Sequence, residues 1–106
     1  MIPAPLQPFP DERGGERGVD AARDRLEDAG VRAHAWSNAP GDRYGAHQHQ
    51  TTKLLICAEG SITFLVGPDE QPVELAAGDG FVLPAGTRHA AVVGPQGCTC
   101  LEGHRP

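Results

Sequence analysis

Two stretches of the sequence decide the fold: Gly41-Asp42-Arg43-Tyr44-Gly45-Ala46-His47-Gln48-His49 and Gly78-Asp79-Gly80-Phe81-Val82-Leu83-Pro84-Ala85-Gly86-Thr87-Arg88-His89. In the first, two histidines two residues apart point to the same side of an extended strand. In the second, a proline-glycine corner precedes a histidine that begins a new strand. Two imidazoles from one strand and a third from a distant strand form a facial set of ligands for a divalent metal. The alternative is a polar surface histidine after a turn.

The residues around these stretches alternate with a period of two, which is typical of strands. We expect eight short strands, at 31–37, 43–49, 53–59, 61–66, 73–77, 81–84, 88–94 and 98–102. Glycine and proline turns separate them, among them Glu59-Gly60 and Gly94-Pro95-Gln96-Gly97. Many short strands without intervening long helices favour an all-β sandwich or jelly roll.

The same residues resemble the cupin family. Its first motif, G-x5-H-x-H-x3–4-E-x6-G, is matched here by Gly41, His47, His49 and Gly60, and its second, G-x5-P-x-G-x2-H-x3-N, by Gly78, Pro84, Gly86 and His89. The resemblance spans residues 41 to 93. It implies a double-stranded β-helix (a cupin-type jelly roll), commonly dimeric, with a metal held near one mouth by His47, His49 and His89.

Two positions depart from the family pattern. Val93 replaces an asparagine that the family does not use as a ligand, whereas Lys53 replaces the glutamate that usually binds the metal. A protonated ammonium cannot donate an electron pair to an ion. The family nevertheless includes three-histidine sites without a carboxylate, as in thiol dioxygenases.

Three alternatives for Lys53 remain open. Its head group turns to solvent or to a carboxylate while the three histidines hold the ion. It stays charged at the barrel mouth and holds an anionic ligand. Or it loses its proton and acts as a base or a ligand.

The pattern and the resemblance together predict a small metal-binding cupin that binds or acts on a small molecule, which is anionic under the second alternative for Lys53. The expected cofactor is one divalent ion, of iron, manganese, nickel or zinc. If the protein is an enzyme, it is a metal-dependent dioxygenase, isomerase or lyase, with Lys53 as a catalytic residue that positions an anionic group or moves a proton. The alternatives are a non-catalytic ligand-binding module, with or without a metal, and a structural or storage role. The fold alone does not choose among them.

The first thirty residues are expected to differ from the rest. We expect an N-terminal arm and a short helix over 1–30 and the cupin barrel over 31–106. Asp20 to Ala29 has helical spacing, with Asp20 as a candidate N-cap and Gly30 as a stop. The exposed strand edges of a small sheet and the unpaired arm favour a homodimer.

Composition restricts the partners of this 106-residue chain. Its net charge is −5 and it lacks a run of basic residues, so we expect no nucleic-acid or anionic-lipid partner. No signal peptide or membrane span is predicted, which favours the cytoplasm. Cys98 and Cys100 share one strand face, where they either fill the core or, less simply, join His104 in a thiolate metal site.

Overall fold

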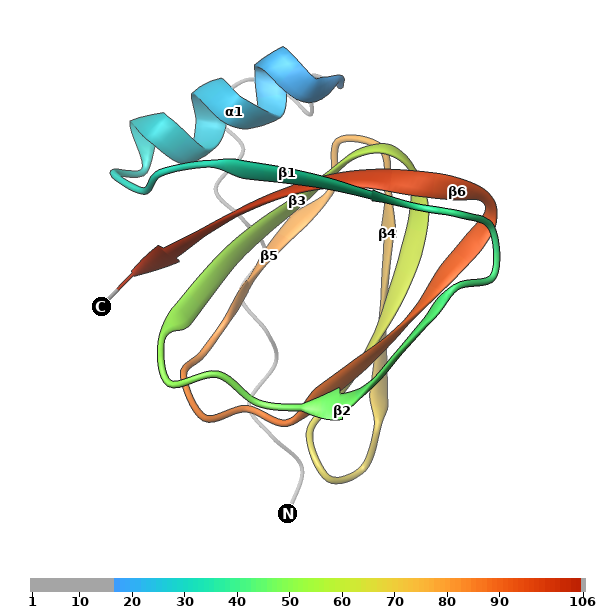
Figure 1. The fold of residues 1–106 in the computed structure, drawn as a ribbon. Helices are drawn as coiled ribbons and strands as arrows, with labels where there is room; N and C mark the ends of the chain where they lie inside the picture. The colour runs from blue at the N-terminus through green and yellow to red at the C-terminus, as the bar shows by residue number, and fades with distance from the viewer. Residues whose placement is uncertain (1–16, 106) are drawn as a thin grey trace.

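A computed structural model describes residues 17–105; the predicted N-terminal arm, up to residue 16, lies outside the described residues. One helix packs against a curved antiparallel sheet of six strands (Figure 1). The elements are α1 (Val19–Asp28), β1 (His34–Asn38), β2 (Arg43–His47), β3 (Thr52–Val66), β4 (Gln71–Ala76), β5 (Gly80–Leu83) and β6 (His89–Arg105). The predicted all-β barrel with a short N-terminal helix is confirmed.

The long strands β3 and β6 organise the sheet. They pair with each other over nearly their whole length, β6 also pairs with β1 and β2, and β3 also pairs with β4 and β5. Figure 1 shows these two strands curving around the barrel, so that segments distant in sequence face one interior. This curvature brings the chain after β2 close to the start of β6.

The prediction of eight strands was wrong at two turns. Glu59-Gly60 lies inside β3, and Gly94-Pro95-Gln96-Gly97 lies inside β6. Gly60 and Gly97 adopt positive φ values of 74° and 76°, and the β3–β6 register shifts on both sides of Gly60. A Cβ on Gly60 would lie 2.0 Å from the Gly97 carbonyl oxygen. The glycines therefore bend two strands in close contact without ending them.

The two faces of β3 belong to two different cores. Leu55 and Cys57 point into the barrel with Phe64 and Phe81, whereas Leu54 and Ile56 point outward, toward α1. This alternation is the period of two that the sequence analysis predicted for the strands. Lys53 has the same parity as Leu55, so its side chain belongs to the interior.

Helix α1 covers the outer face of the barrel. Leu26 is fully buried, and the guanidinium of Arg25 donates a hydrogen bond of 2.8 Å to the Gly78 carbonyl. The predicted cap was wrong, since Gly18 occupies the N-cap position without a side-chain hydrogen bond and Asp20 lies in the first turn. The predicted stop at Gly30 is confirmed, with a φ of 85°. Within residues 17–105, no helix has the length and apolarity that crossing a membrane requires.

The cysteines are packing residues of the inner core. Cys57, Cys98 and Cys100 are free thiols and all are buried. The thiolate site with His104 was wrong, because the His104 ring contacts Glu102 and Thr51 and is largely exposed. Strand β6 turns the ring toward these partners at the barrel mouth.

Candidate metal centre

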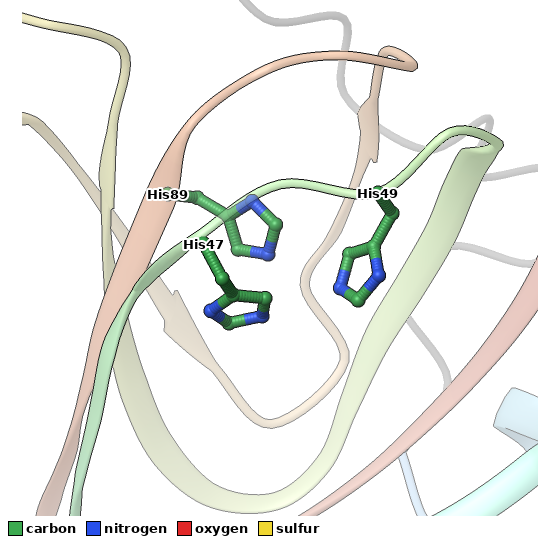
Figure 2. A group of neighbouring side chains, drawn as sticks. All are labelled: His47, His49 and His89. Carbon is green, nitrogen blue, oxygen red and sulfur yellow. The ribbon is translucent and has the colours of Figure 1, made fainter.

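Three imidazoles meet at one end of the barrel interior (Figure 2). His47 ends β2 and lies directly opposite His89, the first residue of β6. The ring centroids of this pair are 4.3 Å apart, and that of His49 lies 4.9 Å from His47 and 5.2 Å from His89. The structure therefore brings together all three of the predicted ligands.

His49 reaches the group differently from the way we expected. The prediction of one strand over 43–49 was wrong, since β2 ends at His47 and His49 lies in the segment after it. The His49 carbonyl accepts a 2.8 Å hydrogen bond from the backbone N–H of Gly86. The proline-glycine corner thus holds the backbone of His49 beside the start of β6. His49 joins the other two histidines because of this long-range contact, and not because it alternates with His47 along one strand.

Backbone carbonyls orient two of the rings. Nδ1 of His47 donates to the Gly45 carbonyl at 2.7 Å, and Nδ1 of His89 donates to the Thr87 carbonyl at 2.9 Å. A carbonyl oxygen only accepts, so the neutral rings carry their proton on Nδ1 and leave the lone pair of Nε2 free. Metal-binding histidines in proteins are commonly oriented by this kind of hydrogen bond.

The donor set fits a divalent ion. The ligand atoms of the three histidines all lie within 4.8 Å of one another. His47 is exposed, His49 half-buried and His89 buried, so the group is open to solvent on one side. Three neutral nitrogens in a partly open pocket suit zinc, iron or nickel better than calcium or magnesium, which prefer oxygen ligands.

Lys53 lies beside this group, inside the barrel. The residue is only 8% exposed, and its Nζ lies 3.3 Å from Nε2 of His49 and 3.2 Å from Oε2 of Glu102. Because an ammonium only donates, the hydrogen bond places the lone pair of His49 toward Lys53. Lys53 thus competes with an ion for one of the three imidazoles and is also held by a carboxylate.

Glu102 is the residue of the site that the sequence analysis missed. Its carboxylate accepts hydrogen bonds from Nε1 of Trp36 at 2.6 Å, from Lys53 and from Nε2 of His104 at 3.1 Å. The signal was present, because Glu102 continues the alternation of Cys98 and Cys100 and therefore points inward. It was overlooked because the strand was expected to end at that residue.

A cavity with a volume of about 180 Å³ adjoins the histidines. Its polar wall consists of His47, His89, Lys53 and Glu102, and the remaining lining residues are Trp36, Tyr44, Leu55, Phe64 and Ala91. At about 30 Å³ per water molecule, this space holds roughly six water-sized groups. It therefore suits a small ligand with a polar end at the histidines and a short apolar part.

The flanking residues divide into two groups. Tyr44 lines the cavity and packs edge-on against Trp36, and its hydroxyl donates a hydrogen bond to Oδ1 of Asn38. Arg43, at the start of β2, and Arg88, just before β6, are exposed to solvent. Trp36 also lines the cavity and contacts Glu102 from its wall.

Burial should make the metal-free protein less stable in mild acid. Burial of the rings is the main cause that lowers the pKa of both His49 and His89 below the usual value of about 6.5. At His49 the charge of Lys53 lowers the pKa further, whereas at His89 the hydrogen bond to the Thr87 carbonyl acts in the opposite direction. The unfolded chain then binds protons first, so stability present above about pH 6.5 is lost as the pH falls toward the folded pKa.

Urea unfolding of metal-free protein at pH 7.5 and 5.5 measures this loss. We expect a smaller free energy of unfolding at pH 5.5, and a smaller difference between the two pH values in His89→Gln. The carboxylates are common to both proteins, so an unchanged pH difference in the variant would contradict the assignment to His89.

Comparisons with known proteins agree with this fold and site. The cupin domain profile matches residues 35–102, which is more than half of the chain. The protein therefore belongs to the cupin family. No curated protein matches the chain.

Several solved structures of cupins are similar to this chain. An RmlC-like cupin from Shewanella frigidimarina is 26% identical with a TM-score of 0.63, over 72% of this chain and 66% of that one. The DMSP lyase DddQ from Ruegeria pomeroyi is 26% identical with a TM-score of 0.64, over 70% of this chain and 37% of that one. Oxalate decarboxylase from Bacillus subtilis, 19% identical with a TM-score of 0.63 over 68% of this chain and 20% of that one, shows the fold alone. The chain thus spans only part of each of these proteins.

Proposed function

We propose that this cupin holds one divalent metal ion with His47, His49 and His89 and binds a small anionic molecule in the adjoining cavity. The observation that carries the proposal is the convergence of three imidazoles, two of them oriented through Nδ1 by backbone carbonyls. The relationship to DddQ, which is named as a lyase, supports a small-molecule ligand.

In this proposal the histidines hold the ion, the apolar wall orients the ligand, and Lys53 supplies a positive charge. When bound, the ion supplies Lewis-acid polarisation of a ligand atom. His47 and His89 leave Nε2 free for the ion, and the apolar wall of Leu55, Phe64 and Ala91 excludes water from the rest of the ligand. Lys53 adds a positive charge at the polar end of the cavity, which favours a carboxylate or another small anion.

The contacts of Lys53 support the first alternative for its role, a head group turned to a carboxylate. Glu102 supplies that carboxylate at 3.2 Å. A paired ammonium still attracts an anion, because Lys53 has three donors and the structure uses two of them. As a catalytic residue, Lys53 would orient the anionic group of a substrate at the ion.

A second candidate function rests on the contact between Lys53 and His49. The hydrogen bond from Nζ to Nε2 uses the lone pair that an ion needs. It favours a metal-free barrel in which Lys53 binds an anionic ligand directly. This candidate is a non-catalytic binding module.

Metal addition separates the two candidates. An ion that binds only the folded protein stabilises it by about 2.7 kcal/mol at 100 times its Kd, which raises the Tm of a domain this size by roughly 10–20 °C. We expect this rise when Zn²⁺ or Mn²⁺ is added to chelator-treated protein. His34→Ala, which removes an exposed histidine of β1, should show the same rise. A Tm raised by oxalate or acetate but not by any metal would favour the metal-free barrel.

The assembly expected from the sequence is a further part of the proposal. The side chains of β2 are all exposed in the single chain, and β1 pairs with β6 alone among the described strands. Such edges commonly pair with another chain. We propose a homodimer, which a measured molar mass in solution would test.

A further inference from the structure

We infer that Glu102 is a positioning residue that makes a lysine compatible with this metal centre. The inference rests on the proposed function and assigns a role to a residue outside the family motifs. Glu102 holds the Lys53 ammonium to one side of the imidazoles, so that an ion binds although position 53 carries a cation.

The contacts around Glu102 are specific. Oε1 accepts from the indole N–H of Trp36, and Oε2 accepts from both Lys53 and His104. The Glu102 side chain is 15% exposed and that of Lys53 10%, so the pair is shielded from bulk water. A carboxylate fixed from both sides is a rigid acceptor, and its position therefore determines where the lysine head group lies.

The position of Lys53 matters because of its neighbour. Its Nζ is within hydrogen-bond distance of both His49 and Glu102, so one ammonium contacts both groups at once. An ion at the imidazoles would repel the ammonium of Lys53. The ion would also need the Nε2 lone pair of His49, which accepts the hydrogen bond from Lys53. Glu102 provides the alternative partner, and without it the ammonium keeps its contact with His49 as an uncompensated charge.

The strand register explains why this carboxylate is available. Leu55 of β3 lies opposite Glu102 of β6, and Lys53 lies opposite His104. Lys53 and Glu102 are thus diagonal neighbours on the inward face, a separation that a long lysine side chain can span. The family pattern has its carboxylate at position 53, on β3. In this chain Glu102 supplies a carboxylate from β6, diagonally across from Lys53.

The test is a double-mutant cycle on Zn²⁺ affinity. Competition with a chromophoric chelator gives the Kd of the full-length wild type, Glu102→Gln, Lys53→Met and the double variant. If Glu102 acts by positioning Lys53, Glu102→Gln should weaken Zn²⁺ binding at least about tenfold more in the wild type than in the Lys53→Met background. A carboxylate that acts only through its own field would weaken binding equally in both, and that result would overturn the inference.

Controls separate charge, folding and the proposed function. Glu74→Gln removes an equal charge from an exposed site on β4 and should leave the Zn²⁺ affinity unchanged. If Glu102→Gln does not fold, Glu102→Asp takes its place in the cycle, because it keeps the charge but not the reach to Lys53. Failure of the wild type to bind Zn²⁺ would overturn the proposed function, whereas binding with no coupling would overturn only the role of Glu102.

Discussion

His89→Ala should lower the affinity for a divalent ion by at least about 100-fold while the barrel stays folded. Loss of an outer-shell partner of a metal ligand commonly costs about 10–100-fold in affinity, so loss of the ligand itself should cost more. His89 is 3% exposed and is held by the Thr87 carbonyl, whereas His47 is exposed. His89 is therefore the most rigidly placed of the three imidazoles, and the remaining two would form a weaker, more mobile site.

The measurement is a Zn²⁺ or Mn²⁺ titration against a competing chelator, with circular dichroism to check folding. His34→Ala is the matched control, since it also removes one histidine, but an exposed one at the start of β1. His89→Gln tests whether the small cavity left by alanine matters, because it nearly keeps the side-chain volume. Wild-type affinity in both His89 variants would rule out the three-histidine centre.

Lys53→Glu should tighten metal binding roughly tenfold or more, which corresponds to about 1.4 kcal/mol. The change removes an ammonium 3.3 Å from Nε2 of His49 and puts a carboxylate at the position where the family pattern has one. Charges about 4 Å apart near a protein surface interact by about 4 kcal/mol, so a reversal of charge beside the ion has a large effect.

The same substitution should make the fold depend more on the metal. Without an ion, the new carboxylate faces Glu102, which would lose its lysine partner while remaining largely buried. The free energy of unfolding of the metal-free variant should therefore fall and be restored by Zn²⁺. Lys53→Met, which removes the ammonium without adding a carboxylate, should give an intermediate affinity. Weaker binding in a folded Lys53→Glu protein would show that position 53 does not face the ion.

Much of the site follows from local sequence. The spacing of His47 and His49, and the corner at Pro84 and Gly86 before His89, predicted three ligands that the structure brings together. The predicted period of two matches the alternation of β3, which places Leu55 and Cys57 in the core of the barrel. These features depend on backbone conformations that neighbouring residues determine, such as turns and the alternation of a strand.

The extent of the strands was harder to predict. Glycine and proline usually end a strand, but Gly60 and Gly97 only bend β3 and β6 where the two strands pack against each other. The convergence of His49 was predicted for the wrong reason, because a hydrogen bond from Gly86, and not strand alternation, holds it in place. In each case a contact between distant segments decided the local structure.

The sequence by itself indicated the class of fold through short-range patterns of turns and alternation, and it indicated the three imidazoles through the spacing of the family motifs. Only the tertiary structure decided the environment of Lys53. Glu102 reaches it through the register of β3 against β6, and Trp36 and His104 reach Glu102 from two further positions. Register is set by the packing of the whole barrel, so no local pattern connects residue 53 with residue 102.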